Sequence, residues 1–412
     1  MLVLWNLCYV LSKKGGFKIE FPSYSKSSLE KKKNWRTFQG LIILVGGNFM
    51  GHIHKKEEIL KELQKRLHHN PIGLPEHSTL YEILTILFSE KEAEVGAKFP
   101  LGFVTIDEIQ ESTGMNRDEL EEILNGMIKK GLVYSSLKDG KTKYLLSPGV
   151  TGFFEMTFMR TDESLPMKRL AELMYTYRNT PEFVKEFFSQ TPRAKAYLYS
   201  GVISKVRSEV LSFDEAEEHI RKAGRGSLGR CYCRHEAWHL GKNCSAPIEN
   251  ICMSLGGASD FLVEHGFAKR ASVSELLEAL KRAEDYGLVH MGDNVMEQTT
   301  FICNCCGCCC GLLEGITKHH LKNAVTTTNY IARVNLEECN GCGLCEERCQ
   351  IKAIRMIGDY PKPDEEICLG CGICAHFCPS RAIKMEERDK RIIPPKTYKD
   401  LIKRLMQEKG RI

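Results

Sequence analysis

"ECNGCGLCEERCQIKAIRM" (residues 338–356) and "ICLGCGICAHFCPSRAIKM" (residues 367–385) align residue for residue, so that Cys368 repeats Cys339. Each copy has the spacing C-x2-C-x2-C-x3-C. The eight cysteines are Cys339, Cys342, Cys345 and Cys349, then Cys368, Cys371, Cys374 and Cys378. We call residues 335–385 the cysteine repeat. Thiolates at this spacing can wrap three corners of a cubane, and Gly343 and Gly372 let backbone amides approach it. The fourth ligand must come from elsewhere.

The cysteine repeat resembles the bacterial ferredoxin domain with two [4Fe-4S] clusters, in which the two copies exchange their last cysteine. The resemblance implies one cluster held by Cys339, Cys342, Cys345 and Cys378, and a second held by Cys368, Cys371, Cys374 and Cys349. Pro379 follows Cys378 as the family pattern expects, whereas Gln350 follows Cys349 where the family has proline. This departure could alter solvent access or reduction potential at the second cluster.

Ten further cysteines lie between residues 231 and 310: Cys231, Cys233, Cys244, Cys252, Cys303, Cys305, Cys306, Cys308, Cys309 and Cys310. The segments C-x-C-R, P-x-E-x-x-C, GLVH and C-N-C-C-x-C-C-C resemble a cysteine-rich module of ferredoxin-like proteins from anaerobic bacteria and archaea. That resemblance spans residues 150–385 and implies a class of protein, with no settled activity attached.

The density of soft thiolate ligands predicts iron–sulfur or zinc binding here, with room for one or two centres beyond the cysteine repeat. One arrangement joins Cys233, Cys244 or Cys252 to members of the 303–310 run around a third cluster. Others are a cluster spread over paired cysteines, similar to the CCG motifs of heterodisulfide reductases although the spacing differs, and a zinc ion. Inert buried thiols are disfavoured, because crowded cysteines pack poorly and oxidise.

Several nitrogen-bearing side chains accompany these cysteines. His290, in the GLVH segment, is a candidate metal ligand. His235 and His239 are four residues apart, so on a helix they share one face and could ligate metal or deliver protons, or simply be polar surface residues. The charges of Arg230, Arg234 and Lys242 could offset those of thiolates.

The expected fold class is α+β, with an N-terminal winged helix, a mainly helical cysteine-rich middle domain and a C-terminal ferredoxin-like domain. The expected divisions are residues 1–49 as a mis-assigned extension before Met50, 50–79 as amphipathic helix and linker, 80–160 as winged helix, 161–320 as middle domain, 330–390 as ferredoxin domain and 391–412 as basic helical tail. The winged helix is predicted from helical patterns at residues 78–89, 105–114 and 115–133 and from a hairpin signal at Asp139-Gly140.

Acidic residues in the predicted recognition helix, Asp118, Glu119, Glu121 and Glu122, argue against DNA as a partner. A formal charge of +5 over 412 residues points to neither nucleic acid nor membrane, and no segment has the apolar length of a membrane span. We find no dinucleotide fingerprint or phosphate loop. Of the 19 cysteines, 18 follow residue 230, and such spacing suits metal binding in a reducing cytoplasm.

The sequence therefore predicts a cytoplasmic electron-transfer protein with two [4Fe-4S] clusters and a further metallocentre, an iron–sulfur cluster or zinc, that serves redox partner proteins. Two alternatives stay open. One is an oxidoreductase whose middle cluster is catalytic, and the other is a redox-responsive regulator in which the winged helix reads DNA.

Overall fold

The computed structural model describes residues 55–138, 140–162, 164–203, 214–242 and 244–412. The predicted extension at residues 1–49 and the turn residue Asp139 lie outside the described residues. Residues Glu57–Ile412 form one compact unit. Among the described residues, no helix has both the length and the apolar character needed to cross a bilayer.

The first part of this unit is a set of short helices followed by a hairpin. After a helix at residues 55–68 come α3 (Ser78–Leu87), α4 (Glu90–Lys98), α5 (Ile106–Thr113), α6 (Arg117–Lys129), β1 (Val133–Lys138) and β2 (Lys141–Leu146). Capping boxes begin α4 at Ser89 and α5 at Thr105, and Gly114, with φ of 71°, ends α5. Val104 bridges to Tyr144 of β2. The helices and hairpin expected from the sequence are present, while their identity as a winged helix remains a prediction.

The predicted recognition helix, α6, begins with Arg117, and this arginine forms two ion pairs. Arg117 contacts Asp107 at 2.5 Å and Glu121 at 3.2 Å, while Glu119 contacts Lys91. Asp118 and Glu119 occupy its first turn. These charges leave little net positive potential for phosphate along this helix.

The middle region is built around a six-stranded sheet that the sequence analysis did not predict. All its paired strands are antiparallel, in the order β3-β7-β8-β5-β4-β6. The strands are β3 (Ala194–Ala196), β4 (Gly226–Gly229), β5 (Cys252–Leu255), β6 (Ala268–Ala271), β7 (Val289–Asp293) and β8 (Phe301–Cys305). Strands of three to five residues with glycine inside, such as Gly226–Gly229, carry almost no alternating pattern, which is why a mainly helical region was expected.

Helices surround this sheet and join it to the N-terminal part. An irregular turn at Gly149–Phe153 leads into α7 (Phe154–Met159), α8 (Met167–Arg178), α9 (Pro181–Phe187), α10 (Ala216–Ala223), α11 (Tyr232–His239), α12 (Gly256–Glu264), α13 (Val273–Asp285) and α14 (Gly311–Thr317). The core that α7 and α8 share with α3 includes Phe153, Phe158 and Tyr177, all fully buried.

The cysteine repeat has two short helices and two pairs of strands: β9 (Tyr330–Val334) with β12 (Ile383–Glu387), β10 (Ile354–Ile357) with β11 (Tyr360–Pro363), and α15 (Leu344–Arg348) and α16 (Ile373–His376). It shares a hydrophobic core with the middle sheet, since Met291 and Cys305 belong to the same buried cluster as Tyr330 and Cys374. The Tyr199 N–H also donates to the carbonyl of Cys371 at 3.0 Å.

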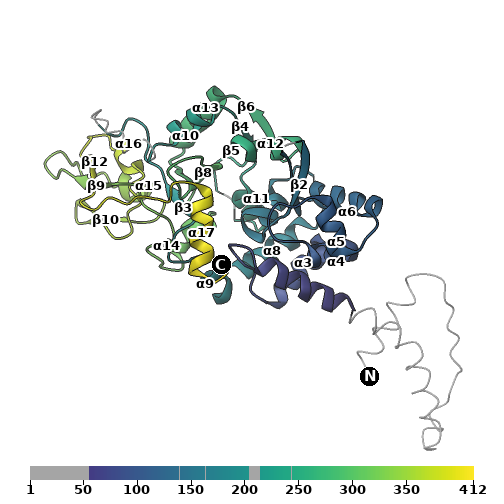
Figure 1. Cartoon of the computed structure of the whole chain (residues 1–412). Coiled ribbons are helices and arrows are strands. Elements are labelled where there is room, and N and C mark those ends of the chain that lie inside the picture. Colours follow the sequence, from purple (N-terminus) through teal and green to yellow (C-terminus); the bar gives the residue numbers. More distant parts are fainter. Residues whose placement is uncertain (1–54, 139, 163, 204–213, 243) are drawn as a thin grey trace, which may run out of the picture. The chain divides into compact units, whose positions relative to one another are not determined.

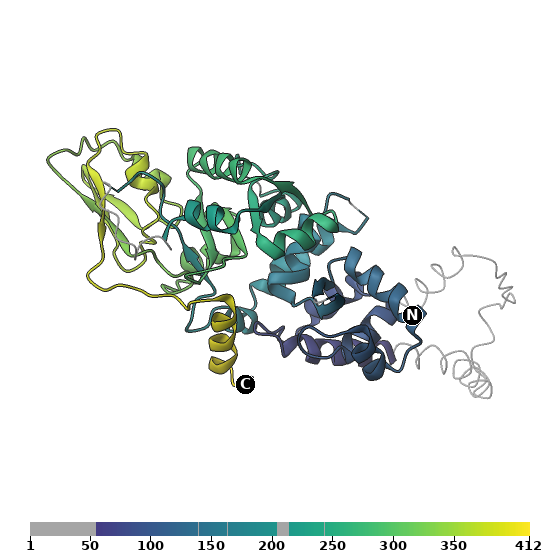
Figure 2. The ribbon, with the colours of Figure 1, turned by 45° about the horizontal axis from the view of Figure 1, so that its top comes forward.

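The C-terminal helix α17 (Tyr398–Glu408) packs away from the cysteine repeat. It is the yellow helix that lies apart from the yellow-green strands of the repeat in Figures 1 and 2. Leu401 and Leu405 are buried against Val295, just beyond β7. Lys409 and Arg411 both contact Glu186 of α9, at 2.7 and 2.8 Å. The tail therefore ties the end of the chain to the middle region.

Candidate metal centres

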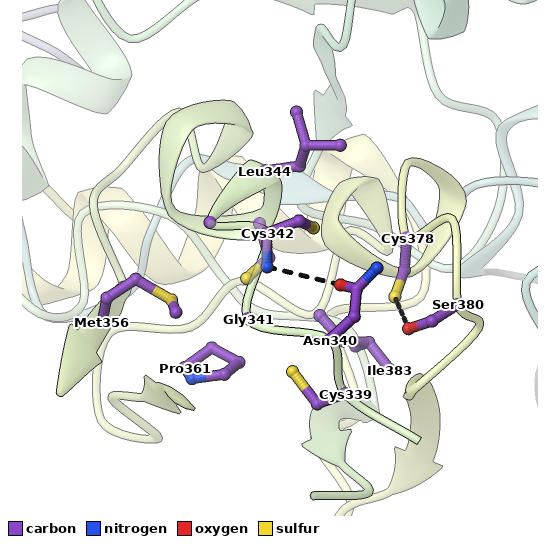
Figure 3. Close-up of a pocket in the computed structure, with 12 residues that line it drawn as sticks. Cys339, Asn340, Gly341, Cys342, Leu344, Met356, Pro361, Cys378, Ser380 and Ile383 are labelled. Atoms are coloured by element: carbon purple, nitrogen blue, oxygen red, sulfur yellow. Dashed lines mark hydrogen bonds between the residues drawn. The ribbon is translucent and has the colours of Figure 1, made fainter. Parts of the chain in front are cut away.

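The first group of repeat cysteines lines one pocket, shown in Figure 3. Its walls contain Cys339, Cys342 and Cys345 from the first motif and Cys378 from the second. Gly341 and Gly343 have φ of 70° and 73°, which turns the loop so that successive thiols face inward. Cys342 is exposed, whereas Cys345 is only 8% exposed. Cys378 thus lies in the pocket of the first motif although it belongs to the second. This placement agrees with the ligand exchange that the sequence resemblance implies.

The second group joins Cys349 to Cys368, Cys371 and Cys374. Burial, together with the neighbouring Cys349 and Cys368 thiols, raises the pKa of Cys371 to about 12. Buried thiols of this kind stay protonated unless a metal ion supplies positive charge, and a coordinated thiol is deprotonated. The Ala353 N–H donates to the Cys349 sulfur at 3.1 Å, as backbone amides do at iron–sulfur ligands. The donor set therefore fits a thiolate-ligated cluster.

Gln350, the departure from the ferredoxin pattern, connects the second group to the middle region. Its side-chain oxygen accepts a hydrogen bond from the Gly307 N–H at 2.8 Å, and its amide donates to the Gly287 carbonyl at 2.8 Å. A Cβ built on Gly307 would lie 1.9 Å from the Gln350 carbonyl oxygen, so only glycine allows this approach. Gly307 stands between Cys306 and Cys308 in the middle cysteine run. A proline at position 350 could make neither side-chain bond.

Four middle cysteines converge tightly. The sulfur atoms of Cys244, Cys306, Cys308 and Cys309 all lie within 4.8 Å of one another, and we call these residues the compact thiol set. The Cys244–Cys306 and Cys308–Cys309 sulfur pairs are each 3.7 Å apart. A tetrahedral ion with metal–sulfur bonds of about 2.3 Å sets its ligand sulfurs about 3.8 Å apart. The spacing fits one tetrahedral ion. In the described part of the chain, no three cysteines of the repeat come this close together.

The other six middle cysteines lie around the end of strand β8. We call them the extended thiol set: Cys231, Cys233, Cys252, Cys303, Cys305 and Cys310. Cys303 and Cys305 are two residues apart on β8 and therefore share a sheet face. Cys231 and Cys310 stand at the starts of α11 and α14. The structure thus divides the ten middle cysteines between two places, a split that spacing alone left open.

Arg234 lies between the two sets and is 1% exposed. Its guanidinium donates to the carbonyls of Pro247 at 3.0 Å and Asn304 at 2.6 Å. The thiols of Cys231, Cys306, Cys252 and Cys305 interact electrostatically with it; burial opposes its charge, but these thiols hold the pKa of Arg234 above its ordinary value. A buried cation at this place would favour the thiolate form of cysteines in both sets.

The histidines flagged from the sequence hold structural contacts. His290 is fully buried, stacks on Tyr199 with ring centroids 4.7 Å apart, and pairs through Nδ1 with the Asn304 side chain at 2.6 Å. His235 Nδ1 lies 2.7 Å from the Phe158 carbonyl. His290 is outside the compact thiol set, and its role as a metal ligand remains a prediction. Asn304, which sequence reasoning missed, is the residue that joins His290 to the cysteine strand.

A second pocket lies beside the extended thiol set. Its lining includes Glu155, Arg178, Tyr232 and the Gly311–Leu312 pair. Tyr232 separates Cys231 from Cys233, and Gly311 follows Cys310. Burial raises the pKa of Glu155, although the Gly152 N–H donates to its carboxylate at 2.8 Å. Arg178 is held by both oxygens of Glu236, at 2.7 and 2.6 Å.

Comparison with known proteins concerns only the cysteine repeat. Residues 332–355 and 361–384 match a family described as 4Fe-4S binding domain, and these residues contain all eight cysteines of the repeat. No curated protein matches the chain, and no solved structure does. The matched motifs, the pocket between the two copies and the buried thiols agree on the kind of domain this is. The C-terminal region of the chain, over residues 332–384, is a ferredoxin-type iron–sulfur domain.

Proposed function

We propose that this chain is an electron-transfer protein of the cytoplasm that carries two [4Fe-4S] clusters in a bacterial-type repeat and a further metal ion at the compact thiol set. The cluster ligands are Cys339, Cys342, Cys345 and Cys378 for one, and Cys368, Cys371, Cys374 and Cys349 for the other. When bound, such clusters accept and release single electrons. The middle region is the cysteine-rich module to which the repeat is fused.

The observation that carries the proposal is the bridge made by Gln350. It joins the backbone beside Cys349, a ligand of the second cluster, to Gly307 between Cys306 and Cys308. Cys342, which lines the first pocket, is exposed. An electron from a partner protein would arrive at the exposed cluster and move through the second cluster to the middle region. The partner oxidoreductase is therefore expected to dock near Cys342.

The test is a metal count on the full chain purified without oxygen. We expect about eight irons with matching sulfide from the two clusters, and one additional ion, zinc or iron, at the compact thiol set. Replacing Cys306 and Cys308 together by serine should remove that ion and leave the reduced ferredoxin EPR signal unchanged. Fewer than about four irons per chain, or clusters that dithionite cannot reduce, would contradict the proposal.

A second candidate function is an oxidoreductase with its active site in the middle region, favoured by the pocket at Glu155, Arg178 and Tyr232. A carboxyl group whose pKa is raised by burial can donate a proton to a bound substrate. Reduction of a small molecule in this pocket should then depend on Glu155. A Glu155→Gln chain that keeps all its metals yet oxidises its reduced clusters no more slowly with any tested substrate would argue against this alternative.

A further inference from the structure

The extended thiol set is a connected series of sulfur contacts. Cys252 interacts with Cys231 and Cys303, Cys305 interacts with Cys303 and Cys310, and Cys310 interacts in turn with Cys233. The thiol partners of the compact set, by contrast, are its own members, as in the contacts of Cys306 with Cys244 and Cys309. The ten cysteines of residues 231–310 therefore form two groups.

Strand pairing explains how residues far apart in sequence form the extended set. Met253 of β5 pairs with Ile302 of β8 in an antiparallel register, which sets Cys252 opposite Cys303. Gly229 of β4 pairs with Cys252 itself, and Cys231 follows two residues later. Cys305 ends β8, and the chain then turns before Cys310 begins α14. Six thiols are thereby collected from three strands or strand ends and two helix starts.

The burial of these thiols needs an explanation. Cys231, Cys233, Cys305 and Cys310 are 5%, 9%, 7% and 3% exposed. Six adjoining thiols make poor apolar packing, because a smaller number of aliphatic side chains would fill the space without polar or oxidisable groups. They make a good ligand set for soft metal ions.

The spacing favours several metal ions over one. In the described part of the chain, no three of these sulfurs come within the 4.8 Å that the compact set satisfies. A single tetrahedral ion binds four ligands whose donor atoms lie close to one another. It therefore cannot bind all six thiols of the extended set. A cluster in which sulfide bridges several irons spreads its thiolate ligands over a larger perimeter.

Polar groups around the extended set suit a negatively charged cluster. Cys310 stands at the N-cap of α14, so the N–H groups at the start of that helix favour negative charge on its sulfur. The Nε of Arg234 is buried without a hydrogen-bond partner in the described structure, although its guanidinium lies among the thiols of Cys231, Cys252 and Cys305. An unpaired buried N–H is costly, and a cluster sulfide or thiolate would be its natural acceptor.

We propose that the extended thiol set, Cys231, Cys233, Cys252, Cys303, Cys305 and Cys310, holds an iron–sulfur cluster of its own, separate from the ion at the compact set. The middle region then contains two metal centres, with Arg234 between them. This goes beyond the proposed function, since it rests on the middle region and requires neither ferredoxin cluster.

The experiment compares two variants of the full chain, both purified without oxygen. One is Cys252→Ser with Cys303→Ser, in the extended set, and the other is Cys306→Ser with Cys308→Ser, in the compact set. The wild-type chain should contain iron and sulfide beyond the roughly eight irons of the cysteine repeat. The extended-set variant should lose the excess sulfide with its iron and keep the single additional ion. The compact-set variant should lose that ion and keep the excess sulfide with its iron. Retention of the reduced ferredoxin EPR signal shows that each chain has folded.

Cys303→Ser alone, at a half-buried position, is the second variant should the double replacement prevent folding. It should lower the excess iron and alter the Mössbauer spectrum of what remains. Wild-type protein with no iron and sulfide beyond the repeat's complement, or excess sulfide that stays at the wild-type level in both extended-set variants, would overturn the proposal. Failure of the proposed function would appear differently, as loss of the ferredoxin signal itself.

Discussion

The cysteine repeat and the middle region bring their thiols together by different routes. In the repeat, Cys339, Cys342 and Cys345 come from one loop, and one exchanged residue, Cys378, completes the group. In the middle region, Cys252 meets Cys303 because two strands pair in a particular register, and Cys244 meets Cys306 across 62 residues of sequence. The first kind of site depends on local turns, whereas the second depends on the packing of the whole sheet.

This contrast predicts how each region responds to the replacement of single residues. A local loop keeps most of its ligands in place when distant contacts are lost, so replacing one ligand should affect one cluster. Sites assembled from several strands depend on the same buried residues. Replacing one such residue should therefore affect several metal centres together. The predictions below probe this difference.

The largest expected effect comes from Cys378→Ala. Although Cys378 belongs to the second motif, its place in the first pocket predicts loss of the cluster bound by Cys339, Cys342 and Cys345. Iron should fall by about four per chain, and the EPR signal that disappears should be the one lost in Cys339→Ala. Cys349→Ala and Cys368→Ala should form the opposite matched pair. If Cys378→Ala resembled Cys368→Ala instead, the ligand exchange would be wrong.

The next effect concerns Arg234, a support shared by both middle thiol sets. Arg234→Met removes two hydrogen bonds from a charged donor, to Pro247 and Asn304, and should lower the free energy of unfolding by about 3–5 kcal/mol. It should also reduce metal binding at both middle sets, because their thiolates lose a buried countercharge. Metal analysis and denaturant unfolding provide the measurement.

The matched control is Lys242→Met, since Lys242 is exposed and contacts the ring of Tyr175 at 4.3 Å. This change should cost no more than about 1 kcal/mol and leave every metal in place. Loss of iron from the cysteine repeat in Arg234→Met would show that the two regions are less independent than their assembly suggests.

The same difference explains what the sequence could predict. The repeat was recognisable because its ligand cysteines lie close together in the sequence, at the spacing C-x2-C-x2-C-x3-C. The assignment of Cys378 to the first cluster came from the resemblance to ferredoxin domains. The middle division was not predictable, because Cys305 and Cys306 are adjacent yet join different sets. Strand β8 ends between them, so the chain turns and the next thiols face a different place. The end of β8 depends on its pairing with β7 and β5, and no local sequence pattern predicts that pairing.

The six-stranded middle sheet could not be predicted from the sequence for a related reason. β3 has three residues, and its Lys195 is completely buried in an ion pair with Asp214 at 3.2 Å. A lysine inside a short apolar run does not suggest a strand whose side chains are all buried. By contrast, the helices α3 and α13 were predictable, since both show apolar spacing of three and four residues and α13 also begins with a capping box at Ser272.

Gln350 tests the connection between the two regions. Gln350→Pro restores the ferredoxin pattern but removes the bonds to Gly307 and Gly287, which should cost about 1–3 kcal/mol of stability. Both clusters of the repeat should remain. Electron transfer from the reduced repeat to the middle region, followed by rapid-mixing spectroscopy, should slow. Gln350→Glu is the control, because it can still accept from Gly307; equal rates in all three chains would exclude this bridge as part of the route.

The smallest expected effect concerns Glu186, which contacts Lys409 and Arg411 at the C-terminal end of the chain. Burial opposes ionisation of this carboxylate, but hydrogen bonds from Arg411, Lys409 and the Gly73 N–H outweigh it and lower the pKa of Glu186. A carboxylate with a lowered folded pKa stabilises the protein above its unfolded pKa of about 4.5, and this stabilisation is lost as the pH falls through the folded pKa.

Glu186→Gln should therefore destabilise the chain by about 1–2 kcal/mol at pH 7 and expose α17 to faster amide hydrogen exchange. Glu182→Gln, at an exposed position on the same helix, should change stability by less than about 0.5 kcal/mol. The difference in α17 protection between wild type and Glu186→Gln should shrink as the pH falls below about 4.5, because the wild-type carboxyl then becomes neutral too. A difference that instead grew with acidity would mean that the ion pair is not what holds the tail, and that the buried Leu401 and Leu405 hold it alone.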